Sequence, residues 1–191
     1  MKNLQGKILE LAKKENACSD QFARFQNATT ERELLQVVKD NFNWCYSRKV
    51  ITVEILDLFT PELIIEFGIY HKGIYPKIQN LNGLVFCGDV KVEMLDNSTV
   101  TKMRGNSTVT EMRGNSTVTE MWDNSTVTEM RGNSTVTKMW GNSTVTKMWG
   151  NSTVKVYSSL FKMPKETKNN FCIINLNTKE IYCGKPFKIN Q

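Results

Sequence analysis

The sequence predicts a mainly β protein, in which a helical N-terminal domain precedes a β-solenoid that is capped by a C-terminal β-hairpin. The first observation behind this prediction is a gapless tandem repeat. Its Asn-Ser-Thr-Val openings recur every nine residues, at Asn97, Asn106, Asn115, Asn124, Asn133, Asn142 and Asn151. A fixed short period of near-identical units is typical of solenoids. The second observation is a series of helix-start signals in residues 1–68, before the repeats begin.

The repeated unit combines strand-forming and turn-forming residues. A full unit, from Asn106 to Gly114, reads Asn-Ser-Thr-Val-Thr-Glu-Met-Arg-Gly. Successive Thr and Val residues favour a strand over a helix. Gly-Asn-Ser favours a corner, because Gly and Asn tolerate positive φ and Ser can bond the backbone of a turn. Each nonapeptide therefore predicts one strand of about six residues and one polar corner.

The register of the strands decides which side chains face the core. The upstream segment 90–96 aligns with the repeat without a gap and places Val90 and Val92 in the two Thr slots. The downstream segment 154–157 agrees only if one residue is lost; without that gap it favours the opposite register. Strands alternate faces with period two, and the opposite register would bury a Lys or Glu in every full unit. The residues expected to face inward are Thr108, Thr110 and Met112, and those expected to face outward are Val109, Glu111 and Arg113.

The number of repeats in one coil is open between two and three. With two, Glu111 would face Glu129 across neighbouring strands. With three, the stacked Lys/Glu slots always carry opposite charges. These pairs are Lys102–Glu129, Glu111–Lys138 and Glu120–Lys147. Opposite charges on adjacent strands are stabilising and like charges are destabilising, so we expect a three-sided β-helix, with the two-sided coil as the alternative.

Residues 1–68 predict a helical N-terminal domain, which we expect to cap one end of the solenoid. Helices are expected over residues 3–15, 19–26, 30–44, 50–59 and 60–68, although 50–59 is ambiguous between helix and strand. Thr30 and Glu33 have the spacing of a capping box. Thr60 followed by Pro61 is a second start signal, and Gly68 is typical of a left-handed helix end.

The remaining chain divides into the solenoid at 69–158 and a C-terminal region at 159–191. Short apolar runs after Ile69, separated by glycines and by Asn82-Gly83 as a strand breaker, predict irregular first coils that lead into the repeats. In the C-terminal region, the apolar runs 171–176 and 180–183 flank a polar turn and predict a hairpin, followed by a basic tail. Because a solenoid end exposes unpaired backbone and apolar core, we expect this hairpin to cap it.

Composition narrows the classes of function. No apolar run approaches 18 residues, so no transmembrane helix is expected, and the N-terminus is charged and amphipathic, unlike a signal peptide. The five Cys lack zinc spacing and are expected to be reduced thiols in the cytoplasm. The single His71 and the carboxylates Glu62 and Glu66 are interpreted as structural or solvated. There is no phosphate loop or nucleophile elbow, so we expect no enzyme, no cofactor and no metal.

Two kinds of repeat protein resemble this chain. The nonapeptide β-rolls of calcium-binding toxins share only the period, because this unit lacks the paired Gly and the Asp that hold calcium in those repeats. Residues 60–183 resemble uncharacterised short-repeat β-solenoid proteins of gut anaerobes and their mobile elements, on Thr60-Pro61-Glu62-Leu63, Gly68-Ile69-Tyr70 and the Asn-Ser-Ser/Thr-Val openings. Their repeats are octapeptides, one residue shorter. This resemblance implies a mobile-element factor acting on a host system, but no activity.

One slot of the repeat is occupied by either Arg or Trp and is expected to face solvent. Its residues, the candidate binding residues, are Arg104, Arg113, Trp122, Arg131, Trp140 and Trp149. In a three-sided coil Trp122 and Trp149 would be neighbours. Trp and Arg are enriched at binding hot spots, so the sequence predicts a non-enzymatic protein-interaction protein. The alternative is that these side chains cover the backbone and stack for stability.

Two further functions remain open. Nucleic-acid binding could use the Arg/Trp face and the basic C-terminal end, where residues 154–191 carry seven Lys against two Glu. Ice binding is suggested because Thr-Val-Thr resembles the Thr-x-Thr arrays of ice-binding solenoids. The expected register disfavours ice binding, since it turns those Thr residues inward.

Overall fold

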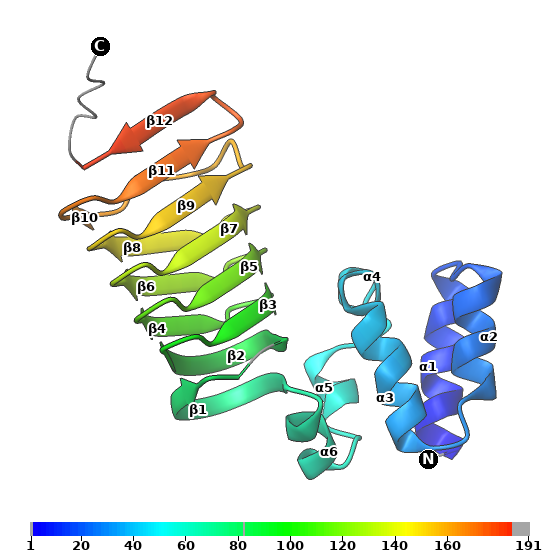
Figure 1. The fold of residues 1–191 in the computed structure, drawn as a ribbon. Coiled ribbons are helices and arrows are strands. Elements are labelled where there is room, and N and C mark those ends of the chain that lie inside the picture. The colour runs from blue at the N-terminus through cyan, green and yellow to red at the C-terminus, as the bar shows by residue number, and fades with distance from the viewer. Residues whose placement is uncertain (1, 82, 185–191) are drawn as a thin grey trace. The chain divides into compact units, whose positions relative to one another are not determined.

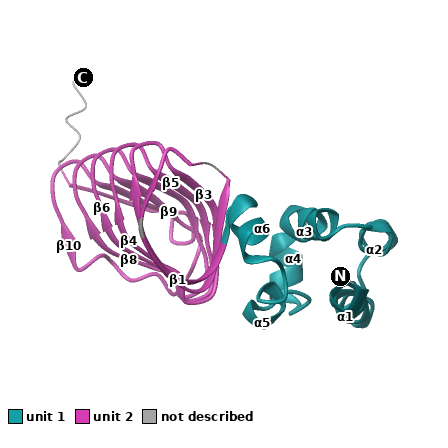
Figure 2. Ribbon diagram, turned by 90° about the horizontal axis from the view of Figure 1, so that it is seen from below, with its two compact units in different colours: residues 1–69 teal, residues 70–191 magenta. Residues whose placement is uncertain are grey.

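The computed structural model describes residues 2–81 and 83–184 and divides the chain into two compact units, Met1–Ile69 and Tyr70–Gln191 (Figure 2). Asn82, expected to break a strand, and Lys185 and Lys188, expected in the basic tail, lie outside the described residues. The first unit is helical and the second is built from strands, so the predicted fold class, a β-solenoid after a helical N-terminal region, is confirmed (Figure 1).

The first unit contains six helices within its described residues. They are α1 (Lys2–Lys14), α2 (Ser19–Asn27), α3 (Glu31–Asp40), α4 (Phe42–Ser47), α5 (Val53–Leu56) and α6 (Pro61–Glu66). The capping box of α3 is present, because the Thr30 hydroxyl accepts from the Glu33 N–H at 3.2 Å and the Glu33 carboxylate accepts from the Thr30 N–H at 3.2 Å. No helix of the described residues is long and apolar enough to cross a membrane.

The long helix expected over 30–44 is interrupted at Asn41. This residue leaves the helical region, with φ −111° and ψ 25°, and its side-chain amide donates to the Val37 carbonyl at 2.9 Å. Asn competes in this way with the helical backbone, which explains the division into α3 and α4. The ambiguous segment 50–59 contains only the single turn of α5. Gly68 has φ 67°, as expected for a left-handed helix end.

The second unit is one continuous sheet wound into a coil. Its strands are β1 (Ile69–Gln79), β2 (Leu84–Leu95), β3 (Thr99–Met103), β4 (Thr108–Met112), β5 (Thr117–Met121), β6 (Thr126–Met130), β7 (Thr135–Met139), β8 (Thr144–Met148), β9 (Thr153–Val156), β10 (Glu166–Thr167), β11 (Cys172–Asn175) and β12 (Glu180–Cys183). The even-numbered strands β4, β6 and β8 stack on one side, and β3, β5, β7 and β9 stack on the other. The long strand β2 starts both stacks, since it pairs with both β3 and β4. Figure 2 shows the resulting flattened coil end on.

The coil has two sides, so the expected three-sided helix is wrong. Val109 is the register partner of Val127, and Val118 is the partner of Val136, so 18 residues complete one coil. Glu111 does face Glu129, the like-charge contact that argued against this arrangement. The repulsion between these two carboxylates is reduced by Arg113 and Arg131, which belong to the Arg/Trp slot of the repeat. Both guanidiniums contact the Glu111 carboxylate, at 2.7 and 2.9 Å. The charge argument failed because it considered one slot alone.

The expected strand register is also wrong. Val109 and Met112 are fully buried, whereas Thr108, Thr110 and Glu111 lie on the outside. The ladder explains this departure from period two: Thr108 and Val109 pair with the next coil, Thr110 is skipped, and pairing resumes at Glu111. The strand turns at the skipped residue, so that two residues three positions apart face the core. Relative to β2, which lacks a matching residue, Thr110 is a bulge. Its hydroxyl donates to the Val92 carbonyl at 3.0 Å.

The flanking strands β2 and β9 lack a residue that corresponds to Thr110 of the repeat, so aligning them with the repeat without a gap gives the wrong register. Upstream, Val92 pairs with Val109 and Met94 pairs with Met112, so two positions in β2 match three in the repeat. Downstream, Val154 and Val156 match Val136 and Met139 in the same way. The gap assumed for the downstream flank is therefore also required upstream.

Gly and Asn at the corners have the roles that the sequence predicts. Gly132 has φ 65°, and a Cβ there would lie 2.9 Å from the Gly114 carbonyl oxygen of the preceding coil. Asn side chains form a ladder along one edge, in which Asn115 donates to Asn97 at 3.2 Å and Asn133 donates to Asn115 at 3.1 Å. These contacts join successive coils at the turns.

The predicted C-terminal hairpin is present. β11 adds to β9 in parallel, and β12 pairs with β11 in the antiparallel direction. The core extends into the hairpin as far as Ile173 of β11, which is fully buried. β10 adds a short strand to β8 on the other side.

Candidate interaction surfaces on the edges of the solenoid

The six predicted binding residues lie on two opposite edges of the coil. Two repeats complete a coil, so corners of alternate repeats belong to alternate edges. We name the first group the aromatic strip; it consists of Arg104, Trp122, Trp140, Tyr157 and Leu176. We name the second group the cationic strip; it consists of Arg113, Arg131, Trp149 and Lys168. The order within each strip follows from backbone hydrogen bonds between successive coils. For example, the Trp140 N–H donates to the Met121 carbonyl at 2.9 Å, and the Tyr157 N–H donates to the Met139 carbonyl at 3.0 Å.

The aromatic strip is a stack of rings. The centroids of Trp122 and Trp140 are 5.3 Å apart with planes at 14°, and those of Trp140 and Tyr157 are 4.9 Å apart at 25°. At one end the Arg104 guanidinium lies 5.1 Å from the Trp122 centroid, and only 4% of this Arg is exposed. At the other end follows Leu176, which is 46% exposed. The rings are half-buried, so they present edges rather than faces to solvent.

Two expectations for these residues are therefore wrong. Trp122 is stacked on Trp140 and not next to Trp149, because neighbours along an edge are two repeats apart. Arg104 is buried and not exposed; its guanidinium lies over the Trp122 ring, and its Nε is 3.8 Å from the Asp123 carboxylate. Stacking for stability, the alternative considered from the sequence, accounts for much of this burial.

The cationic strip places Trp149 between positive charges. The Arg131 guanidinium lies 4.3 Å from the ring centroid, and the Lys168 ammonium lies 4.9 Å from it. Both distances are within the range of cation–π contacts. The exposed guanidiniums of Arg113 and Arg131 also contact the carboxylate of Glu111.

The cationic strip is balanced by a parallel column of carboxylates. These carboxylates are Glu93, Glu111, Glu129 and Glu166, beside Arg113, Arg131, Lys147 and Lys168. A hydrogen bond and charge from Lys168 lower the pKa of Glu166, so this carboxylate is ionised at neutral pH. These four carboxylates therefore pair with the three cations of the strip and with Lys147 beside it.

Sequence reasoning missed Tyr157 and Leu176. Tyr157 falls in the Arg/Trp slot once the residue lost from the downstream unit is counted, so the alignment contained its signal. Leu176 carries no repeat signal, because it follows β11 after a segment unrelated to the nonapeptide.

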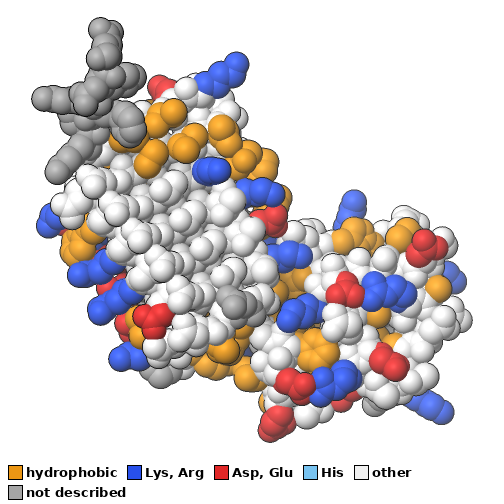
Figure 3. Space-filling model, viewed as in Figure 1, with side chains coloured by type: hydrophobic (Ala, Val, Ile, Leu, Met, Phe, Trp, Pro, Cys, Tyr) orange, Lys and Arg blue, Asp and Glu red, His pale blue; other side chains and the backbone are white. Residues whose placement is uncertain are grey.

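The broad sides of the coil carry Thr side chains, contrary to the expected register. The first Thr slots stack across β4, β6 and β8, and the Thr126 and Thr144 hydroxyls are 3.2 Å apart. Figure 3 shows one broad side as a white area of uncharged polar side chains and backbone, with hydrophobic side chains gathered along its upper edge. The structure thus presents regular rows of hydroxyls to solvent.

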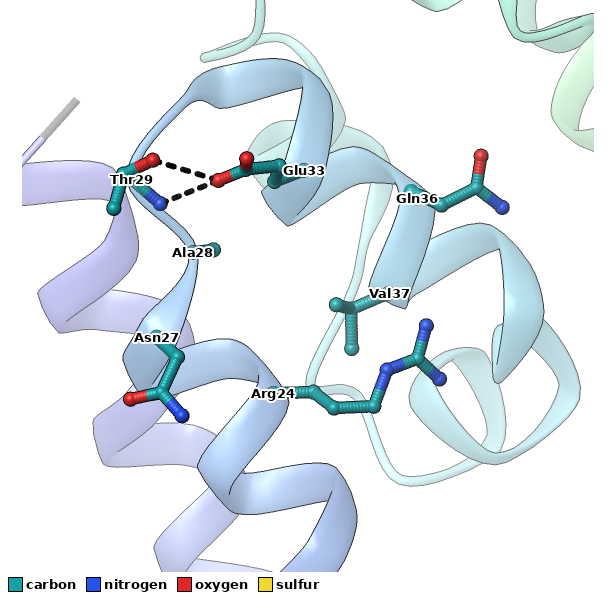
Figure 4. A pocket seen from close by; sticks show the side chains of 7 residues that line it. All are labelled: Arg24, Asn27, Ala28, Thr29, Glu33, Gln36 and Val37. Atoms are coloured by element: carbon teal, nitrogen blue, oxygen red, sulfur yellow. Dashed lines mark hydrogen bonds between the residues drawn. The ribbon is translucent and has the colours of Figure 1, made fainter.

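The helical unit contains small open pockets. One, of about 410 Å³, is lined by Arg24, Asn27, Ala28, Thr29, Glu33, Gln36 and Val37 (Figure 4). Its carboxylate, Glu33, accepts from the Thr29 N–H at 2.7 Å and from the Thr29 hydroxyl at 2.8 Å. These bonds lower the pKa of Glu33, which is thereby assigned to helix capping and not to acid–base chemistry.

The other titratable groups named from the sequence belong to different units of the chain. His71 lies on β1 of the second unit, and Glu66 of the first unit is paired with Arg32 at 2.6 Å. Among residues 2–81 and 83–184, no three His, Cys, Asp or Glu side chains are grouped to hold a metal ion. Comparisons with protein-family models, curated proteins and solved structures give no match to this chain.

Proposed function

We propose that this protein is a non-enzymatic interaction protein whose solenoid presents the aromatic strip to a protein partner. The observation that carries the proposal is the continuous stack Trp122–Trp140–Tyr157, extended by the exposed Leu176. Aromatic side chains are enriched in protein interfaces, where their large apolar area is buried at low entropic cost.

The stack is preorganised for binding. Each ring is held by its neighbours and by backbone bonds between coils, so binding would order few additional rotamers. The exposed ring edges form a straight apolar strip beside a polar broad side. A partner with a complementary apolar ridge, such as the hydrophobic face of a helix, fits this surface.

The ring geometry favours a protein partner over a nucleic acid. Binding of single-stranded nucleic acid needs free aromatic faces on which bases stack. The faces of Trp140 are covered by Trp122 and Tyr157, and Trp149 lies between Arg131 and Lys168. The Arg residues that would contact phosphates are already paired with Glu.

The test compares Trp140→Lys with Trp149→Lys. The two residues occupy the same slot of successive repeats but lie on opposite edges, so each variant controls for the other. Proteins captured from an extract of the native host by the wild-type chain are identified and then quantified with both variants. We expect the partner to bind Trp149→Lys as well as the wild-type chain and to bind Trp140→Lys at least about 30-fold more weakly, equivalent to ~2 kcal/mol.

Two outcomes would contradict the proposal. Normal binding by Trp140→Lys would remove the aromatic strip as the site. Loss of binding with Trp149→Lys alone would move the site to the cationic strip. Circular dichroism of both variants checks that the coil is folded.

A second candidate, ice binding, is favoured by the outward Thr columns. Thr hydroxyls repeat along the stack at the strand spacing of about 4.8 Å, on a rigid sheet. The register that argued against this function is wrong. Thermal hysteresis of the wild-type chain and of Thr126→Lys decides it: activity lost in the variant supports ice binding, and no activity in the wild-type chain rejects it.

A further inference from the structure

The C-terminal hairpin brings two thiols into contact. Cys172 of β11 and Cys183 of β12 are register partners, and the Cys183 Sγ donates to the Cys172 Sγ at 3.3 Å. Neither thiol is enclosed by the core, because Cys183 is exposed and Cys172 is half-buried. The other cysteines differ: Cys45 and Cys87 are buried, and the exposed Cys18 belongs to the helical unit.

The type of strand pair suits a covalent bond. The Gly184 N–H donates to the Phe171 carbonyl at 3.0 Å, so the two cysteines between them form a non-hydrogen-bonded antiparallel pair. Cα atoms in such pairs are about 4.5 Å apart, within the range that a disulfide spans. The sulfurs need to approach by about 1.3 Å to reach the bond length of about 2.05 Å, which side-chain rotation supplies.

We propose that Cys172 and Cys183 form a reversible disulfide that locks the C-terminal hairpin at the end of the solenoid. The turn between the strands already closes one end of the hairpin, and the bond closes the other. In the described chain, β12 has β11 as its sole strand neighbour. The disulfide would therefore hold β12 in place against the edge of β11.

The chemistry is thiol–disulfide exchange with a low-molecular-weight disulfide, such as oxidised glutathione. The Cys183 thiolate attacks this disulfide, forms a mixed disulfide and releases one thiolate. Cys172 then loses its proton to solvent and attacks the Cys183 sulfur, releasing the second thiolate. Two protein thiols are oxidised and one small disulfide is reduced to two thiols, so atoms and electrons balance.

The environment of the thiols supports this order of attack. Burial, and to a smaller extent the hydrogen bond with Cys183, raises the pKa of Cys172 to about 11. The Cys172 thiolate is therefore scarce at neutral pH. Cys183 is the more accessible sulfur and meets the small disulfide first.

The test uses the full chain with Cys18→Ser, which removes the exposed thiol of the helical unit. After incubation with oxidised glutathione, mass spectrometry should show a chain lighter by two hydrogen atoms and a peptide cross-linked through Cys172 and Cys183. With Cys172→Ser added, the product should instead retain glutathione at Cys183. A stable glutathione adduct as the main product of the chain with both thiols would overturn the proposal.

The locking role is tested without altering either cysteine. Amide hydrogen exchange of β12 is compared in the oxidised and reduced forms of the Cys18→Ser chain. We expect exchange in β12 to slow at least about tenfold on oxidation and to recover when a thiol reductant is added. Equal exchange in both forms would show that the bond, even if formed, locks nothing.

Discussion

Val109 and Met112 lie three positions apart in one strand, and both are completely buried in the solenoid core. Strict alternation would place them on opposite faces. The bulge at Thr110 brings them to the same face, and the same arrangement recurs in every full repeat, where the Val and Met slots line the core.

This relationship predicts opposite effects of the same substitution at adjacent positions. Val109→Lys should unfold or strongly destabilise the coil, because an unpaired charge would enter the apolar core. Thr110→Lys should cost only about 1 kcal/mol, mainly through loss of the hydroxyl bond to Val92. Urea unfolding of both variants measures the difference. A larger loss of stability for Thr110→Lys would contradict the register.

Deleting repeats should show a two-unit period. Removing residues 115–132 takes out one complete coil and leaves every later corner on its original edge. Removing only residues 115–123 moves every later strand to the opposite side of the coil, so that β9 and β11 no longer continue the stack of β3. Thermal unfolding should therefore be cooperative for the two-unit deletion and impaired for the single one. A single-unit deletion as stable as the two-unit deletion would be inconsistent with the coil.

The corner glycines allow steric crowding to be separated from backbone strain. Gly132 and Gly83 both have positive φ, at 65° and 71°, but a Cβ at Gly132 meets the Gly114 carbonyl at 2.9 Å while one at Gly83 meets nothing within 4 Å. Ala at either position incurs roughly 1 kcal/mol of left-handed strain. Gly132→Ala should cost more than Gly83→Ala, and equal losses in chemical denaturation would mean that the coils are less tightly stacked at the corner.

The helical unit should lose stability in acid partly through Glu33. Backbone bonds from Thr29, the largest cause, and from Thr30 hold its pKa below the ordinary value of 4.5. Because the folded pKa is the lower one, this contribution is complete above 4.5 and is lost as the pH falls through the folded value. Glu33→Gln should flatten this part of the acid unfolding curve. An unchanged curve would show that the carboxylate bonds contribute nothing.

The sequence was sufficient to predict the solenoid, its corners and its hairpin, because these follow from period and local turn chemistry. The Asn ladder and the Gly corners are local consequences of Gly-Asn-Ser. The capping box at Thr30 and Glu33 is equally local.

The register and the number of sides could not be predicted, because each depends on a contact between slots or coils. Glu111 and Glu129 repel each other, and this repulsion is reduced by Arg113 and Arg131, which occupy a different slot of the repeat. The bulge is visible only when Val92 and Met94 are paired with Val109 and Met112. The candidate residues were therefore correctly placed at corners but wrongly grouped, since Trp122 stacks on Trp140 and not on Trp149.

The two-sided coil determines which residues form each strip, and one cross-linking measurement tests it most directly. Thr126 and Thr144 are two repeats apart, with hydroxyls 3.2 Å from each other, whereas Thr117 and Thr144 are three repeats apart and lie on opposite sides. Cys is introduced at 126 and 144 in one variant and at 117 and 144 in the other, and both are oxidised as monomers. The structure predicts a disulfide between positions 126 and 144 in the first variant and none between positions 117 and 144 in the second. The reverse result would contradict the two-sided coil.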